Sequence, residues 1–328
     1  MALPLVLLAH PLTPEWISSL QGRVRLVVGP ADPPGFAAHL KEFLGEAEGI
    51  LCLLTDKVDG DLLEAAPRLR VVSNMAVGFD NIDVAGCTRR GIPVGNTPGV
   101  LTDATADLAM ALLLSAGRML PKAAMDARDG LWRTWSPIGW LGTDLRGATL
   151  GIVGLGKIGK AVAERARGFG LKLIYCDPKQ QTEPEAAYDI HYCSLDELLR
   201  TSDFVSLHCP LSEQTRSLID ETALKKMKGG AVLVNTARGP IVSSDALVRA
   251  LRENWIGWAA LDVTDPEPLP PEHPLYDLPN CLIVPHIGSA THGTRRRMAE
   301  MACENLLAGL DGRKLPNLVN PDVIIRRE

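Results

Sequence analysis

Arg238, Glu267 and His286 are of the residue types that hold a carboxylate and move a proton. A guanidinium is a rigid, always charged fork that fits a carboxylate. Histidine titrates near neutrality, and a carboxylate partner stabilises its protonated form, so the imidazole can deliver a proton. Taken singly, each residue has a structural alternative: an arginine paired with a surface acid, a glutamate in an exposed loop, or a histidine satisfied in the core.

A glycine-rich motif precedes these three residues, and its sequence is Gly154-Leu155-Gly156-Lys157-Ile158-Gly159. It follows a predicted strand at 150–153 and opens a predicted helix, which is the context of the dinucleotide fingerprint. The helix N-terminus attracts a diphosphate there, whereas outside that context the glycines would fit a plain turn equally well. All six residues are therefore predicted to contact a dinucleotide. Together with the cation, carboxylate and imidazole downstream, they suggest proton and hydride chemistry on a carboxylate-bearing substrate.

Asp177 follows the next predicted strand, 18 residues after Gly159. The fingerprint expects an acid that binds the adenosine ribose hydroxyls at about 20 residues. A carboxylate repels a 2′-phosphate, and Pro178 rather than an arginine comes next, so NAD(H) is favoured. NADP(H) remains possible because Lys179 can pair with a phosphate. The alternative for Asp177 is a solvated turn residue.

The bulk composition bounds the class of protein. A chain of 328 residues predicts two domains, and 46% hydrophobic with 22% charged residues is ordinary globular composition. A net charge of −5, with no basic run longer than Arg295-Arg296-Arg297, argues against nucleic-acid binding. Seven cysteines without a C-x-x-C pair fit a reduced cytoplasm and no zinc knuckle.

Neither a membrane segment nor a metal site is expected. The apolar N-terminus lacks a basic region and is interpreted as a strand, and the most apolar helical stretch, residues 108–116, is too short to span a bilayer. The histidines other than His286 lack a mutual spacing typical of metal ligands; they are His10, His39, His191, His208, His273 and His292.

Strand-length apolar runs alternate with helical patterns along most of the chain. This alternation predicts an α/β fold with two doubly wound parallel sheets. The first set of strands is predicted at 5–9, 24–28, 50–54, 71–74 and 93–96, with helices around Glu15, His39, Leu62 and Val84. The second set is predicted at 150–153, 173–176, 204–207, 232–234, 259–261 and 282–284.

A long helix at 102–119, capped by Thr102 or Asp103, is predicted to link the two sets. A loop with three tryptophans follows the helix. A final helix at 294–310 is expected to cross back and pack on the first domain.

Five segments in order carry a resemblance to a known family: residues 74–83, 154–159, 235–239, 261–270 and 285–291. The chain resembles the D-2-hydroxyacid dehydrogenases, and within them the glyoxylate/hydroxypyruvate reductases. The resemblance implies a Rossmann coenzyme domain at 101–290, including the linking helix and a dimerisation loop. That domain is inserted into a flavodoxin-like substrate domain formed by 1–100 and 291–328.

The same resemblance implies a reaction and three catalytic roles. Glyoxylate or hydroxypyruvate would be reduced to glycolate or D-glycerate with NAD(P)H. Arg238 would bind the substrate carboxylate and polarise the 2-oxo group, His286 would be the general acid, and Glu267 would hydrogen-bond the imidazole.

Further site residues are implied in the same way, each with a structural alternative. The amides of Val77 and Gly78 would grip the substrate carboxylate, unless they form only a tight turn. Ser289 and Trp140 are also expected at the substrate, although Trp132, Trp135 and Trp140 equally suit a core or a subunit interface. The nicotinamide half of the cofactor would be lined by Thr105, Pro210, Thr236, Ala237, Asp262 and Gly288. Asp262 is alternatively a helix or loop cap.

Rival functions remain open at this point. Phosphite dehydrogenases resemble the chain but carry a lysine at the position of Val77, and formate dehydrogenases need a glutamine at that of Glu267. A non-catalytic, NAD-sensing corepressor built on the same frame is the alternative from another class. The family further implies a homodimer. Pro240 and Ser243 depart from residues common in relatives, and Asp177 differs from the arginine-bearing loop of NADPH-preferring reductases.

Overall fold

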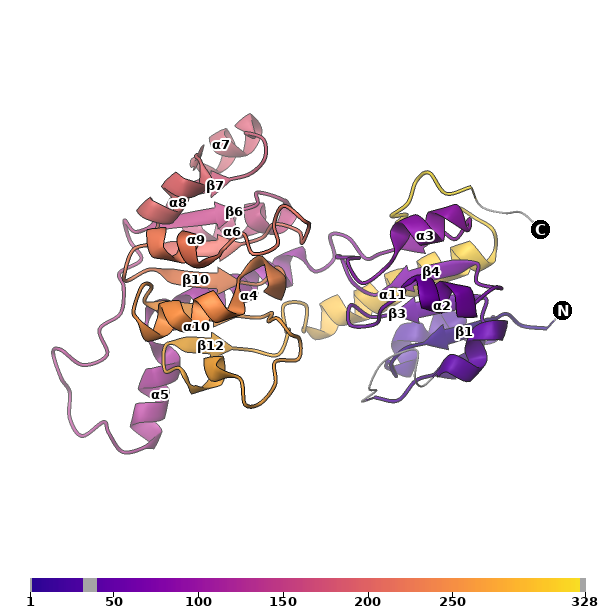
Figure 1. The fold of residues 1–328 in the computed structure, drawn as a ribbon, viewed down its shortest axis with the longest axis horizontal. Helices are drawn as coiled ribbons and strands as arrows, with labels where there is room; N and C mark the ends of the chain where they lie inside the picture. Colours follow the sequence, from indigo (N-terminus) through magenta and orange to yellow (C-terminus); the bar gives the residue numbers. More distant parts are fainter. Residues whose placement is uncertain (1, 32–39, 325–328) are drawn as a thin grey trace. The chain divides into compact units, whose positions relative to one another are not determined.

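The computed structural model describes residues 2–31 and 40–324. The chain divides into two compact units. The split unit consists of Met1–Leu101 and Thr291–Glu328, and the inserted unit is Thr102–Ala290. Each unit is an α/β structure around one parallel sheet (Figure 1). The described residues form five strands in the split unit and seven in the inserted unit. The predicted fold class is confirmed.

The sheet of the split unit has the strand order β2-β1-β3-β4-β5. All its neighbouring strands are parallel, and the order 2-1-3-4-5 is that of flavodoxin-like folds. The helix predicted around Glu15 is a short 3₁₀ helix, and the helix predicted around His39 lies outside the described residues. The elements are β1 (Leu5–Leu8), η1 (Pro14–Leu20), β2 (Arg25–Val28), η2 (Lys41–Glu46), β3 (Gly49–Cys52), α2 (Gly60–Ala65), β4 (Val71–Asn74), α3 (Val84–Arg89) and β5 (Val94–Gly95).

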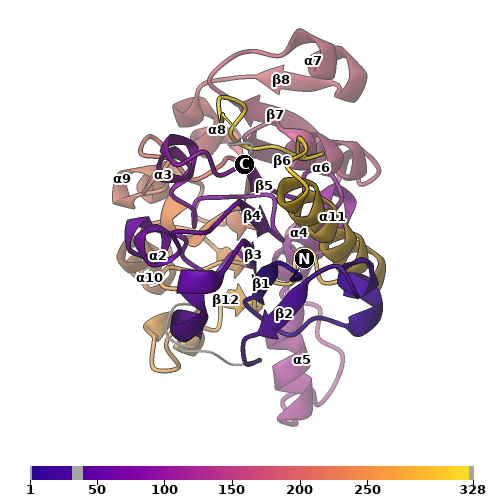
Figure 2. The same ribbon diagram turned by 90° about the vertical axis from the view of Figure 1, so that its right-hand side faces the viewer.

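The last helix, α11 (His292–Leu310), packs on this sheet as the sequence predicted. Its residues Ala302 and Leu306 are fully buried in one cluster with residues of β1, β3 and β4. Gly309 has no room for a side chain, because a Cβ there would lie 2.5 Å from Val71. Figure 2 shows α11 on one face of the sheet and α2 and α3 on the other. The C-terminal helix thus completes the two-layer cover of the first sheet.

The sheet of the inserted unit has the order β12-β11-β10-β9-β6-β7-β8, entirely parallel. Counted from β6, this is the Rossmann order 3-2-1-4-5-6 with one further strand. The sequence did not predict β8, an edge strand of three residues whose last two are exposed. The strands are β6 (Thr149–Val153), β7 (Lys172–Cys176), β8 (Ile190–Tyr192), β9 (Phe204–Leu207), β10 (Val232–Asn235), β11 (Trp258–Leu261) and β12 (Cys281–Ile283).

Helices cover both faces of this second sheet. α4 (Thr102–Gly117) and α6 (Lys157–Arg167) pack in one cluster, and Arg165 of α6 joins them by ion pairs to Asp103 and Asp107. The other cluster is formed by α8 (Leu195–Thr201), α9 (Glu221–Lys226) and α10 (Ser244–Arg252). The remaining elements are α5 (Leu120–Arg128), α7 (Thr182–Tyr188), η3 (Gly239–Ile241) and η4 (Pro274–Asp277).

The linking helix α4 ends at Gly117, two residues before the predicted end. The chain turns at Met119, whose φ of 52° is left-handed, and α5 begins at the next residue. No single helix of the described chain combines the length and apolar content needed to cross a bilayer. α4 and α5 meet that criterion only as a pair bent by 59°, and α4 is a core helix here.

Candidate active site

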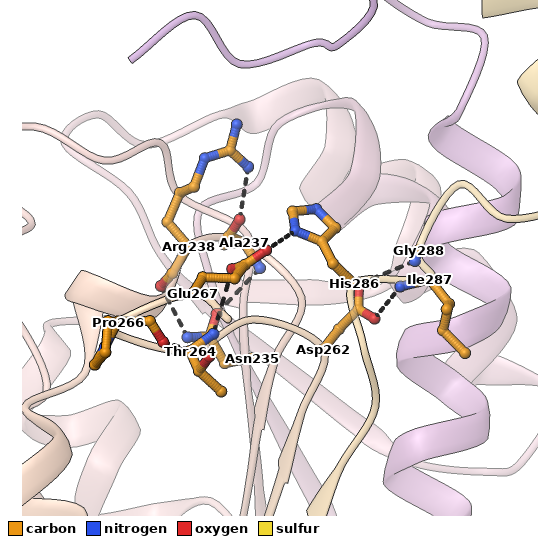
Figure 3. A network of polar contacts seen from close by, with 10 residues as sticks. All are labelled: Asn235, Ala237, Arg238, Asp262, Thr264, Pro266, Glu267, His286, Ile287 and Gly288. Carbon is orange, nitrogen blue, oxygen red and sulfur yellow. Dashed lines mark hydrogen bonds and ion pairs between the residues drawn. The ribbon is translucent and has the colours of Figure 1, made fainter. Parts of the chain in front are cut away.

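The three predicted catalytic residues follow the carboxyl ends of adjacent strands of the inserted unit. Arg238 comes shortly after β10, Glu267 lies in the loop after β11, and His286 comes shortly after β12. Parallel strands direct their carboxyl ends to one edge of the sheet, where open α/β sheets bind ligands. Figure 3 shows the three side chains together on one side of these strand ends.

His286 and Glu267 are in direct contact. The Nδ1 atom of the imidazole lies 2.5 Å from Oε1 of the carboxylate, and the two side chains are 23% and 28% exposed. In this arrangement Nδ1–H donates to the carboxylate, so a proton exchanged with a substrate would pass through Nε2. This contact is the one that the predicted roles of general acid and orienting carboxylate require.

The backbone of His286 is held in an unusual conformation by Asp262. His286 has a φ of 50°, in the left-handed region that costs a non-glycine residue about 1–2 kcal/mol. The buried carboxylate of Asp262 accepts the N–H groups of Ile287 at 2.6 Å and Gly288 at 2.9 Å, and its carbonyl accepts that of His286 at 3.0 Å. Asp262 thus caps the loop that carries the imidazole (Figure 3).

Burial also perturbs the titration of Asp262. Desolvation raises the pKa of this carboxyl above its ordinary value, against the opposing effects of the Ile287 N–H, the nearby His286 and the Gly288 N–H. Gly288 is required for this close approach, because a Cβ there would lie 2.9 Å from Oδ2 of Asp262. The contacts of Asp262 are those of a loop cap, the alternative that the sequence left open. Cofactor binding by this residue stays a prediction.

Asn235 shapes the turn that presents Arg238. Its side chain accepts the N–H of Ala237 at 3.0 Å and donates to the carbonyl of Arg238 at 2.9 Å. The guanidinium of Arg238 donates to the carbonyl of Ala237 at 2.8 Å. Asn235 was not predicted as a site residue from the sequence, although an asparagine at a strand end is a common turn former.

The turn with Arg238 and the loop with Glu267 touch backbone to backbone. A Cβ at Gly239 would lie only 1.8 Å from the carbonyl oxygen of Thr264, so no other residue fits there without a shift. The Thr264 hydroxyl donates to the carbonyl of Pro266 at 2.8 Å, and the Ser244 hydroxyl donates to that of Asp265 at 2.8 Å. These contacts fix Arg238 and Glu267 relative to each other.

Each of the three glycines of the fingerprint has a different local environment. Gly154 has a φ of 94°, and a Cβ there would lie 2.7 Å from the backbone nitrogen of Cys209. A Cβ at Gly156 would meet nothing within 4 Å, which leaves the chain open to a ligand. A Cβ at Gly159 would lie 2.3 Å from the carbonyl of Gly154, so helix and turn pack closely. These are the turn, the approach to pyrophosphate and the helix packing that a bound dinucleotide requires.

Asp177 lies directly after β7 and is tied to this turn. Its Oδ2 accepts the N–H of Leu155 at 2.8 Å. Lys157 and Ile158 open α6, whose N-cap residue Gly156 provides no side-chain cap, so the first N–H groups of the helix remain for an anion. The fingerprint, the acid and the helix N-terminus therefore form one site that fits a dinucleotide.

The other predicted cofactor residues of the inserted unit, and the predicted substrate residue Ser289, lie at the same sheet edge or beside it. Thr105 of α4 is buried and donates to the carbonyl of Gly288 at 3.3 Å. Thr236 is buried too, and within the described chain its hydroxyl has no hydrogen-bond partner. Pro210 is exposed after β9, and Ser289 is buried in the loop that carries His286.

Val77 and Gly78 lie in the split unit, in the loop after β4. Their carbonyls accept side-chain amides, that of Val77 from Asn96 at 2.8 Å and that of Gly78 from Asn74 at 2.9 Å. Among the described residues, no hydrogen bond uses the N–H group of either residue. The loop thus holds its carbonyls inward and keeps two donors for another acceptor.

Trp140 is not brought to Arg238, Glu267 and His286. Its indole N–H donates to Asp126 of α5 at 2.8 Å, and Asp126 also pairs with Lys122. Figure 1 shows α5 and the loop that follows it projecting from the inserted unit.

In the part of the chain that the structure describes, no three histidine, cysteine, aspartate or glutamate side chains form a potential metal cluster.

The sequence matches a known family over residues 110–288, that of the NAD-binding domain of D-isomer specific 2-hydroxyacid dehydrogenases. A glyoxylate reductase of Korarchaeum cryptofilum is 46% identical over 322 residues, which cover 98% of this chain and 97% of the relative. A glyoxylate reductase of Aeropyrum pernix is 52% identical over 300 residues, or 90% and 89% of the two chains.

The fold has a solved counterpart in the NADPH-dependent glyoxylate/hydroxypyruvate reductase of Sinorhizobium meliloti, determined in complex with NADP and malonate. The TM-score is 0.85 at 32% sequence identity, and the match covers 99% of each chain. The sequence matches, the two parallel sheets and the histidine–glutamate pair at the strand ends all agree with this family. The chain is an oxidoreductase and belongs to the D-isomer specific 2-hydroxyacid dehydrogenase family.

Proposed function

We propose that the protein reduces glyoxylate to glycolate and hydroxypyruvate to D-glycerate with a reduced nicotinamide dinucleotide. The observation that carries this proposal is the 2.5 Å contact of His286 with Glu267 beside Arg238 at one sheet edge. The names of the relatives in Korarchaeum and Aeropyrum support glyoxylate as a substrate.

Each residue of the trio has a distinct task in this reaction. The Arg238 guanidinium binds the substrate carboxylate and polarises the neighbouring 2-oxo group. Nε2–H of His286 donates its proton to the oxo oxygen as that atom gains negative charge. Glu267 accepts Nδ1–H throughout, which fixes the tautomer and stabilises the imidazolium. The bound nicotinamide supplies the hydride.

The split unit is proposed as the substrate domain and the inserted unit as the coenzyme domain. In the split unit, the N–H groups of Val77 and Gly78 bind the substrate carboxylate, and in the inserted unit Ser289 contributes to the substrate site. The coenzyme is held by residues 154–159, by Asp177 and by the residues that line its nicotinamide half. The latter are Thr105, Pro210, Thr236, Ala237, Asp262 and Gly288.

NADH is the proposed cofactor, with NADPH as the alternative. The carboxylate of Asp177, fixed beside the glycine turn, disfavours a 2′-phosphate, and exposed Pro178 follows where an arginine would be needed. Lys179 is exposed and is the residue through which NADPH would be accepted. The reductase of Sinorhizobium meliloti, which shares this fold, is NADPH-dependent, which supports NADPH as the alternative.

A homodimer in the cytoplasm is proposed, with the projecting arm of residues 118–144 as its interface. Large apolar side chains of this arm are more than half exposed, which is unusual for a monomer surface. They are Leu120, Met125, Leu131, Trp132, Trp135, Ile138 and Leu141. Trp140, on the same arm, is the proposed contact to the partner subunit's active site. Analytical ultracentrifugation of Trp135→Asp together with Ile138→Asp should give a monomer, and a wild-type monomer would contradict the interface.

The proposed reaction is tested by steady-state rates with four oxo acids: glyoxylate, hydroxypyruvate, pyruvate and phenylpyruvate, each with NADH and with NADPH. The proposal predicts the highest kcat/KM for glyoxylate or hydroxypyruvate with NADH. Oxidation of neither nucleotide by any of the four acids, or turnover only with phosphite or formate and NAD, would contradict it.

A further inference from the structure

The side-chain amide of Gln181 joins Asp177 to the glycine turn. Its Nε2 donates to Oδ2 of Asp177 at 3.3 Å and to the carbonyl of Leu155 at 3.2 Å. The N–H of Leu155 donates to the same Oδ2 at 2.8 Å. The Gln181 amide therefore bridges the Leu155 carbonyl and the acid oxygen that already accepts the Leu155 N–H.

Gln181 is half-buried, and its backbone is tied to a residue of the core. Its N–H donates to the hydroxyl of Tyr175 at 2.6 Å, and that hydroxyl donates to Glu185 of α7 at 3.0 Å. Tyr175 is fully buried in β7 and packs edge-on against Tyr192, with ring centroids 5.4 Å apart. The Tyr192 hydroxyl donates to the carbonyl of Asp177 at 3.3 Å.

These contacts make the two carboxylate oxygens of Asp177 different. Oδ2 receives two donors from the protein, whereas no hydrogen bond of the described residues reaches Oδ1. A carboxylate held in this way keeps Oδ1 for a ribose hydroxyl group and cannot rotate away from a 2′-phosphate. Its repulsion of a phosphate is then undiminished, because the charge stays in place.

We propose that Gln181 is a positioning residue that sets the discrimination between NADH and NADPH by fixing Asp177. This inference depends on the proposed function, in which Asp177 binds the adenosine ribose. Gln181 acts only through Asp177 and the turn, so it governs binding of the dinucleotide and leaves the proton transfer by His286 unchanged.

The direct test is dinucleotide binding to the whole protein without any oxo acid, measured by nucleotide fluorescence. Gln181→Met keeps the length of the side chain and removes the amide. Loss of hydrogen bonds to a charged partner should raise the Kd of NADH about 5- to 10-fold and lower the ratio of the NADPH and NADH dissociation constants by a similar factor. The kcat with glyoxylate at saturating NADH should stay within about twofold of wild type.

Gln180→Met is the matched control. Gln180 is the exposed neighbour, and its amide contacts Glu185 at 3.0 and 3.1 Å rather than Asp177. Its replacement should leave both dissociation constants unchanged. Gln181→Glu, which has nearly the same shape but places a second negative charge beside Asp177, should weaken both nucleotides and serves if the methionine variant folds poorly.

A double-mutant cycle separates positioning from a direct contact. In an Asp177→Ala background, Gln181→Met should change the ratio of the two dissociation constants less than twofold. An unchanged NADH affinity in both Gln181 variants, or an effect that persists without Asp177, would overturn the inference while leaving the reductase intact. A wild-type protein that binds neither nucleotide would instead contradict the proposed function.

Discussion

Replacing Glu267 with glutamine removes the negative charge beside His286 and leaves the shape of the side chain nearly unchanged. The substitution replaces the 2.5 Å hydrogen bond from Nδ1–H to the carboxylate by a bond to a neutral amide oxygen, between side chains that are about three-quarters buried in the wild type. A hydrogen bond between two charged groups is roughly twice as strong as one between neutral groups. Stabilisation of the imidazolium should therefore fall when the carboxylate becomes an amide.

The expected size follows from the strength of such bonds. Hydrogen bonds to charged groups contribute about 1.5–3 kcal/mol and neutral ones about 0.5–1.5 kcal/mol. Because the pair is partly exposed, a loss of about 1–2 kcal/mol in transition-state stabilisation is expected, which is about 5- to 30-fold in kcat/KM. The amide of the variant can also turn its NH₂ toward Nδ1 and favour the wrong tautomer, which would place the effect at the upper end.

The assay is the initial rate of NADH oxidation at several glyoxylate concentrations. Glu272→Gln is the control, because Glu272 is an exposed carboxylate of the same segment. This control should keep wild-type kinetics, and both variants should bind NADH as the wild type does. A Glu267→Gln enzyme within twofold of wild type in kcat/KM, with NADH binding intact, would refute the role given to this carboxylate.

Three other perturbations test separate parts of the site. Arg238→Ala removes the guanidinium proposed to bind the substrate carboxylate and should lower kcat/KM for glyoxylate by about 10²-fold or more, largely through KM. An unchanged KM would contradict the assignment. Asp262→Asn keeps one acceptor for two backbone N–H groups, so the loop of His286 should loosen, with a fall in Tm and in kcat; wild-type values of both would refute the loop-cap role. His208 is partly buried, and desolvation lowers its pKa from 6.5 to about 4, so the unfolded chain binds more protons between these values. The contribution of neutral His208 to the free energy of unfolding should therefore be fully present above about pH 6.5. The free energy of unfolding should decline by about 2–3 kcal/mol as the pH falls toward 4. Urea unfolding of His208→Gln should lose this part of the pH dependence, and an identical profile would contradict it.

The sequence was sufficient for the sheets and for the packing of the last helix, because their strands are short, continuously apolar runs in regular alternation with amphipathic helices. It did not predict β8, since Ile190–Tyr192 is too short for a periodic pattern and lies at the sheet edge with two exposed residues. The end of α4 was placed two residues late, because the sequence does not show that Met119 adopts a left-handed conformation.

A candidate site could be proposed from the sequence only where residue type already limits chemistry. The glycine fingerprint, the arginine and the histidine are recognisable because few other residues perform their tasks. Asn235 and Gln181 were missed because their roles depend on partners in space: the turn of Arg238 for one, and Asp177 with Leu155 for the other. The exposure of the arm around Trp135 likewise follows from the fold and not from its composition.

The most direct test of the central claim is the rate of a single turnover, with enzyme in excess over NADH and glyoxylate saturating, compared between the wild type and His286→Asn. If the imidazole delivers the proton, the wild type should form one glycolate for each NADH oxidised, and the variant should be slower by about 10²-fold or more while binding NADH normally. Equal rates in the two proteins would show that the proton comes from another group and would contradict the account.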